Sequence, residues 1–87
     1  MTKPTGDREL GARLRELRNE KGLKLAVIAD RSGVSLAYVS EVERGRKLPS
    51  LDILSRLAGA LEMSVSDVLR GVESYNRINQ RRAGHRS

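Results

Sequence analysis

At 87 residues the chain is long enough for one small domain with a tail, and no separate ligand-sensing or peptidase domain is expected. Apolar residues make up 38% of it and include neither Phe nor Trp, so an aliphatic core is predicted. The absence of Cys excludes disulfides and thiolate metal sites and fits a reducing compartment. No apolar run approaches the ~18 residues of a membrane span, and residues 1–9 carry no hydrophobic signal segment, so a cytoplasmic location is predicted.

The chain is basic, with 17 Lys and Arg against 11 Asp and Glu and a net charge of +6. A balance of this size attracts polyanions such as DNA, RNA or acidic membrane surfaces. Half of the excess, however, lies in residues 71–87, which contain Arg77, Arg81, Arg82 and Arg86 against Glu73. These tail arginines are interpreted either as non-specific DNA contacts or as residues that aid solubility, so the net charge alone does not identify the partner.

The first predicted element is a helix from Asp7 to about Lys21. Residues 1–6 precede it without periodicity and are expected to be flexible. Asp7 is a candidate N-cap, and Gly22 ends the helix. The apolar stripe of this helix consists of Leu10, Leu14 and Leu17, at i, i+4 and i+7. Its cations Arg8, Arg13 and Arg15 are interpreted as a solvated face, with DNA contact as the alternative.

Two short helices follow, joined by the three-residue turn Ser32-Gly33-Val34. The first is predicted over residues 25–32 and the second over residues 35–44, with Ser35 as N-cap and Gly45 in the left-handed C′ position. On the second helix, the residues on the inner side are Val39 and Val42, and those on the outer side are Ala37, Ser40, Glu41 and Arg44. A small, mostly polar outer face with Arg44, Arg46 and Lys47 beside it suits insertion into a DNA groove.

Two further helices complete the predicted bundle. Ser50 caps the fourth, which runs to about Leu61 and is apolar over so much of its circumference that a central position is expected. Its first stripe consists of Leu51, Leu54, Ala58 and Leu61, and its second of Ile53 and Leu57. Ser64 begins the fifth, whose buried side consists of Val65, Val68 and Leu69. Val72 and Tyr75 continue this stripe and leave open an extension past Gly71, whereas disorder is expected after about Asn79.

The two short helices have the arrangement of a helix-turn-helix, in which the second helix enters the major groove of DNA. From Leu10 to Leu69 the chain closely resembles the helix-turn-helix domain of phage-repressor and Cro-like regulators, the XRE family. The matching segments are LGARLRELRNEKGL (10–23), IADRSGVS (28–35), YVSEVERGRKLPS (38–50) and LSRLAGALEMSVSDVL (54–69). The resemblance implies an all-α, compact, five-helix, lambda-repressor-like domain over residues 7–71. Residues 72–87 are then an extension that is partly helical and then disordered.

The resemblance also implies roles for individual residues. The positions that face base edges are Leu36, Ala37, Ser40 and Glu41. The positions at the DNA backbone are Lys24, Leu25, Ser35, Tyr38, Arg44, Arg46 and Lys47, with the backbone N–H groups at the start of the second helix. Arg18 and Glu43 match a pair that forms a buried structural salt bridge in the family.

The sequence departs from the family pattern at two places. Leu25 stands where the family usually has a phosphate-contacting Gln, so that contact is lost or left to the backbone. Leu36 and Ala37 stand where Gln, Arg or Asn is usual, and they can pack only on thymine methyl groups, whereas Glu41 can accept a hydrogen bond from a cytosine amino group. Readout through DNA shape is therefore expected as well. Leu36 could equally be a core residue at the edge of the helix.

The leading hypothesis is a dimeric, sequence-specific regulator of transcription, a repressor rather than an activator, that binds a pseudo-palindromic operator in double-stranded DNA. Half-sites should lie about 34 Å apart. Dimer contacts are expected from the region 60–72, extended by Tyr75 and Ile78. The alternative is an antitoxin-type module whose main partner is a protein. An RNA-binding module is poorly supported, since Tyr38 and Tyr75 are the only aromatic residues available for stacking on bases.

No enzyme is predicted. The single His, His85, lies in the tail, no Cys is present, and no carboxylate pair is placed where a fold would bury it in a pocket. No cofactor, metal site or small-molecule site is expected on the same grounds.

Overall fold

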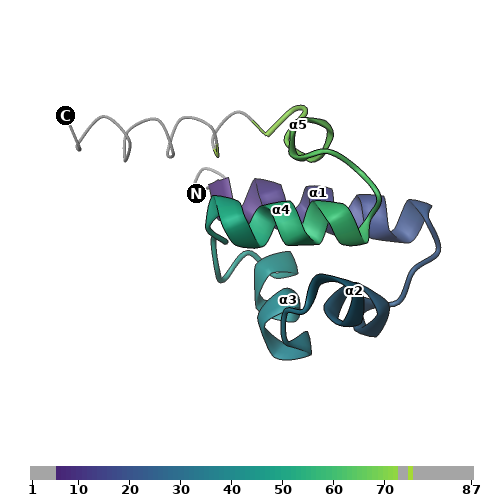
Figure 1. The fold of residues 1–87 in the computed structure, drawn as a ribbon. Helices are drawn as coiled ribbons and strands as arrows, with labels where there is room; N and C mark the ends of the chain where they lie inside the picture. The colour runs from purple at the N-terminus through teal and green to yellow at the C-terminus, as the bar shows by residue number, and fades with distance from the viewer. Residues whose placement is uncertain (1–5, 73–74, 76–87) are drawn as a thin grey trace.

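The computed structural model describes residues 6–72 and Tyr75, and for Gly6 and Asp7 it describes the backbone alone (Figure 1). Outside the described residues lie the predictions made for residues 1–5, Arg77, Ile78, Arg81, Arg82, His85 and Arg86, and for disorder after Asn79. None of the helices within residues 6–72 has both the length and the apolar character needed to cross a membrane.

Five helices form in the described part of the chain, close to the predicted positions. They are α1 (Gly6–Glu20), α2 (Leu25–Ser32), α3 (Leu36–Glu43), α4 (Leu51–Ala60) and α5 (Val65–Val68). The prediction that Asp7 caps α1 is wrong, because the helix already includes Gly6. The three predicted serine caps are confirmed: the hydroxyl oxygens of Ser35, Ser50 and Ser64 accept from the amides of Tyr38, Ile53 and Asp67 at 3.1, 3.2 and 3.0 Å.

The short helix α5 ends well before the tail. Its C-cap is Leu69, and Gly71 has a φ of +86°, in the left-handed region, so a continuous helix does not run through this residue. Arg13 of α1 donates from Nε to the carbonyl of Val68 (3.2 Å) and from Nη2 to that of Asp67 (3.1 Å). Neither reading of Arg13 made from the sequence is therefore right, because its guanidinium satisfies carbonyls at the end of α5.

The helices pack so that α2 and α3 form one end of the molecule. α2 packs on α4 and on α3, α3 packs on α1, and α5 packs on both α1 and α4. Figure 1 shows α2 and α3 together below α1 and α4, with α5 above them. The helix-turn-helix is therefore supported from one side only, and its other side faces outward.

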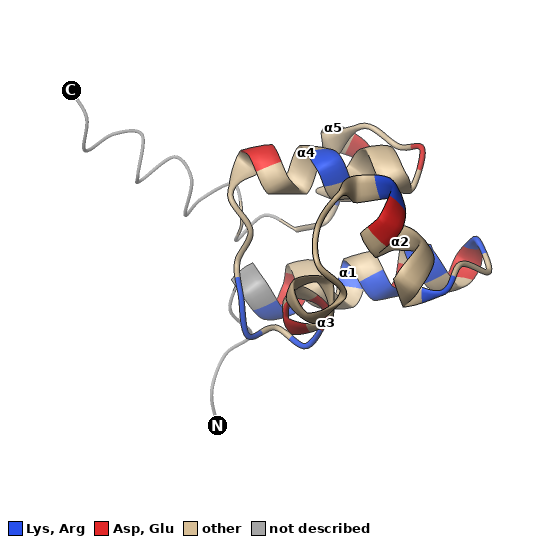
Figure 2. Cartoon of the chain, turned by 60° about the horizontal axis from the view of Figure 1, so that its bottom comes forward, with Lys and Arg blue, Asp and Glu red and all other residues tan. Residues whose placement is uncertain are grey.

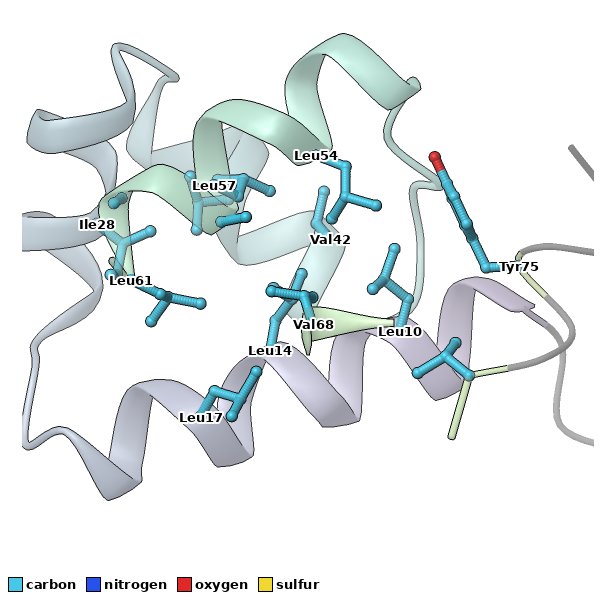
Figure 3. Packing of buried hydrophobic residues seen from close by; sticks show 14 residues of the cluster. Leu10, Leu14, Leu17, Ile28, Val42, Leu54, Leu57, Leu61, Val68 and Tyr75 are labelled. Atoms are coloured by element: carbon cyan, nitrogen blue, oxygen red, sulfur yellow. The ribbon is translucent and has the colours of Figure 1, made fainter. Parts of the chain in front are cut away.

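The core lies between these helices and is largely aliphatic, as predicted. In Figure 3 the leucines of α1 point toward Val42 of α3 and toward the leucines of α4. The buried apolar residues are Leu10, Leu14, Leu17, Ile28, Val39, Val42, Leu54, Leu57, Ala58, Ala60, Leu61, Val68, Val72 and Tyr75. No buried side-chain nitrogen or oxygen in the described part of the chain lacks a hydrogen-bond partner.

Three apolar residues differ from their predicted roles. Leu51 is 57% exposed, because at ~100° per residue it lies about 90° away from the centre of the side of α4 that Leu54, Leu57 and Leu61 bury. Tyr75 is fully buried and adds an aromatic ring to the core. Dimer contacts were expected from the region 60–72, extended by Tyr75 and Ile78, but Val72 and Tyr75 are both inside the protomer's own core and are not available for them.

Candidate nucleic-acid interface

The two sides of α3 differ in burial as the helical wheel predicts. Val39 and Val42 are buried on the inner side. Leu36 and Ala37 are exposed, and Ser40 and Glu41 are half-buried. Leu36, which the sequence left open between the core edge and the outer face, is 50% exposed. The four positions assigned to base edges thus share one accessible side of a short helix.

An ion pair fixes the end of α3 to α1. Arg18 donates from Nε to Oε2 of Glu43 at 2.8 Å and from Nη2 to Oε1 at 3.0 Å, while its Nη1 donates to the carbonyl of Leu23 at 2.9 Å. The Arg18 and Glu43 side chains are only 16% and 9% exposed. The hydrogen bond to Glu43, and then its negative charge, raise the pKa of Arg18 against the desolvation that lowers it. This pair is structural and does not face outward.

Close contact between two backbones fixes the same end of α3. Gly11 of α1 is buried, and a Cβ built on it would lie 2.7 Å from the carbonyl oxygen of Glu43 and closer still to that of Val42. Only glycine allows α1 and α3 to approach this closely. The sequence analysis missed this residue, although a glycine in the interior of a helix costs about 1 kcal/mol relative to alanine and could have been noticed for that reason.

The segment from Arg44 to Pro49, called the basic loop below, leaves α3 through a Schellman motif. The amide of Gly45 donates to the carbonyl of Val42 at 3.1 Å, and that of Arg46 donates to the carbonyl of Glu41 at 2.9 Å. Gly45 has a φ of +78°, and a Cβ on it would lie 3.0 Å from both Cα and Cγ of Arg8. The loop therefore starts in contact with the first turns of α1.

The cations of the basic loop are accessible. Arg44, Arg46 and Lys47 are all exposed, and Figure 2 shows basic residues along the loop that passes beside α3. Arg46 Nη1 lies 3.8 Å from Oε2 of Glu41, with 67% of the Arg46 side chain and 33% of the Glu41 side chain exposed. A pair this open to water contributes little to stability, so Arg46 can exchange Glu41 for another anion at small cost.

The start of α2 differs from the starts of α3, α4 and α5. Its N-cap residue is the exposed Lys24, whose side chain makes no cap hydrogen bond, whereas serine hydroxyls cap the other three helices. As in α3, the first turn holds no acidic residue. Amide groups at such an end, with a lysine beside them, suit an anion. Leu25 is half-buried and packs against the core, so the side chain that replaces the usual Gln supports the fold. Tyr38 also packs against the core with part of its surface exposed.

No cluster of His, Asp and Glu that could hold a metal ion occurs in residues 6–72 or at Tyr75. A cavity of about 10 Å³ lies beside the ion pair, lined by Leu14, Arg18, Ile28, Val39, Glu43, Leu57 and Leu61. A space of this size holds at most about one water molecule.

Comparison with known proteins shows to which family this chain belongs. The family model described as "Helix-turn-helix domain" matches residues 9–70. The chain belongs to the XRE family of helix-turn-helix proteins. The predicted five-helix, lambda-repressor-like fold of this XRE-family chain is confirmed by its structural neighbours.

Named relatives of the XRE-family chain include regulators from several bacteria. The HTH-type transcriptional regulator DdrOP3 of Deinococcus deserti is 49% identical over 67 residues, which cover 77% of this chain and 52% of that protein. The crystal structure of the clp gene regulator ClgR from C. glutamicum matches with a TM-score of 0.76 and 44% identity, over 82% of this chain and 92% of that one.

The restriction-modification controller protein C.AhdI from Aeromonas hydrophila matches with a TM-score of 0.69 and 40% identity, over 71% of this chain and 94% of that one. The chain spans about half the length of the curated relatives that it matches.

Proposed function

We propose that this XRE-family chain is a sequence-specific, double-stranded DNA-binding regulator of transcription that inserts α3 into the major groove. The observation that carries the proposal is the arrangement of α3 itself. Its inner side is fixed by Gly11 and by the pair of Arg18 and Glu43, while its outer side is accessible and has exposed cations beside it. The names of DdrOP3 and ClgR, which describe regulators, support the same function.

The proposed contacts fall into two classes. Leu36 and Ala37 pack on thymine methyl groups, and Ser40 and Glu41 meet polar groups on base edges. Phosphates are bound by Arg44, Arg46 and Lys47 of the basic loop, by Lys24 with the first amides of α2, and by Ser35 and Tyr38 at the start of α3. Because four of the proposed phosphate contacts come from cationic side chains (Lys24, Arg44, Arg46 and Lys47), affinity should depend strongly on salt.

The regulator is proposed to act in the cytoplasm as a repressor. It is proposed to bind as a homodimer to two half-sites about 34 Å apart. With Val72 and Tyr75 inside the core, the dimer surface is assigned to the partly exposed apolar residues Met63, Val65 and Leu69 around α5. Sedimentation of the protein with and without an operator duplex tests this part of the proposal, because it counts the protomers on each duplex.

The experiment that tests DNA binding is selection from a random duplex library. The winning duplex and a scrambled control are then titrated at two salt concentrations. An enriched inverted repeat bound about 10³-fold more tightly than the control is expected. If no sequence is enriched and all binding disappears with salt, only the positive charge of the surface is at work and the proposal is wrong.

Two variants separate the two classes of contact. Arg46→Ala should weaken binding of both duplexes and lower the salt slope by about one for each protomer. Glu41→Ala should change which sequence is selected and should also raise the affinity for the scrambled duplex, since it removes a carboxylate 3.8 Å from Arg46. Arg56→Ala is the matched control: it removes an exposed cation from α4 and should change both affinities by less than about twofold.

A further inference from the structure

The far end of the basic loop is held by a residue that the family pattern does not include. Tyr75 is fully buried, and its hydroxyl donates to the carbonyl oxygen of Pro49 at 3.0 Å, across 26 positions of sequence. Pro49 is itself among the fully buried side chains. The match to the family model ends at residue 70, so Tyr75 belongs to the extension that follows it.

The contacts of the loop show why this hydrogen bond matters. Its first part is held by the Schellman motif and by the contact of Gly45 with Arg8. Beyond Arg46, the hydroxyl of Tyr75 donates to the backbone of the loop at Pro49. Arg46 and Lys47 are exposed and lie between these two attachments. The position of both cations therefore depends on an attachment at each end.

We propose that Tyr75 is a positioning residue for DNA binding, which holds the basic loop so that Arg46 and Lys47 are presented to phosphates. The inference rests on the proposed function, because it concerns the phosphate contacts assigned there. It makes Tyr75 part of the DNA-binding machinery through the loop that it holds, with no contact between Tyr75 and DNA required. Anything that removes Tyr75 from its place would weaken binding to all sequences without changing which sequence is preferred.

The test compares Tyr75→Phe with Leu61→Val. Tyr75→Phe keeps the ring in the core and removes only the hydroxyl. Leu61→Val is a matched control for lost stability, because Leu61 is buried at the C-cap of α4, about 15 Å along the helix from Leu51, whereas Pro49 precedes the other end of the helix. Two quantities are measured for each variant: hydrogen exchange of the Arg46 amide, which donates to the carbonyl of Glu41, without DNA, and affinity for the selected and scrambled duplexes.

Tyr75→Phe should raise the exchange rate of the Arg46 amide about threefold to tenfold and weaken binding of both duplexes by a similar factor. Leu61→Val should change neither hydrogen exchange in the loop nor the affinity for the duplexes. The inference is overturned if the exchange rate of the Arg46 amide is unchanged in Tyr75→Phe, or if Leu61→Val weakens binding as much. If the unmodified protein binds neither duplex, the proposed function fails, whereas a protein that binds normally and is unaffected by Tyr75→Phe refutes the inference alone.

Discussion

Breaking the ion pair between Arg18 and Glu43 should destabilise the domain far more than a surface pair would. Both side chains are nearly enclosed, at 16% and 9% exposure, and are joined by two hydrogen bonds. Removing one partner leaves the other charge stranded, which costs ~3–5 kcal/mol for a buried pair. Because both side chains keep some exposure to water, Glu43→Leu should lower the free energy of unfolding by about 3 kcal/mol, near the lower end of that range. Arg18→Met should cost about 1 kcal/mol more, because the carbonyl of Leu23 also loses its donor.

The double variant Arg18→Met/Glu43→Leu distinguishes a stranded charge from lost packing. Because it buries no unpaired charge, it should be within ~1–2 kcal/mol of the unmodified protein. The coupling energy of the cycle should therefore exceed ~2 kcal/mol. A loss of about 3 kcal/mol is large against a total of ~5–15 kcal/mol. It should lower the melting temperature of a domain this small by about 12–24 °C.

Urea unfolding followed by circular dichroism measures these values, since the chain has no Trp for fluorescence. The raised pKa of Arg18 means that its contribution is present at every pH below the ordinary value and is lost only above the raised one. The coupling energy should thus be equal at pH 7 and pH 9. Additive losses in the double variant, or a loss below ~1 kcal/mol in Glu43→Leu, would refute the reasoning.

Two further substitutions test the contacts of α1 by the same unfolding assay. Gly11→Ala should cost at least ~2 kcal/mol, because its Cβ meets backbone oxygens that belong to α3, such as that of Glu43 at 2.7 Å. Gly59→Ala is the control, because Gly59 lies in α4 and a Cβ added there would have nothing within 4 Å. It should stabilise the domain by ~0.5–1 kcal/mol. Equal effects at the two glycines would contradict this account. Arg13→Ala should cost ~1–3 kcal/mol through the carbonyls that it leaves at the end of α5, whereas the exposed Arg15→Ala should stay within ~0.5 kcal/mol.

The elements of this fold could be predicted because their signals are local. Ser35, Ser50 and Ser64 each act on an amide three residues away, and the apolar stripes follow from helix periodicity alone. The outer side of α3 follows from the same periodicity once Val39 and Val42 are assigned to the core.

The features that could not be predicted depend on partners far along the chain. Arg13 looks like a solvated cation, yet it reaches carbonyls 54 and 55 residues away. Tyr75 continues an apolar stripe, but its hydroxyl meets Pro49 only after the whole bundle has formed. In each case the residue type allows several roles, and only the packing selects one.

The division of α3 into a clamped side and an accessible side has a consequence for re-targeting. The residues that hold α3 in place are Gly11, Arg18, Val39, Val42 and Glu43. The side chains at the four positions assigned to base edges, Leu36, Ala37, Ser40 and Glu41, take no part in that attachment. A new combination at these outer positions should therefore inherit the same scaffold and the same approach angle to the duplex. A gene duplicate could in this way acquire an operator of its own while its stability stays almost unchanged.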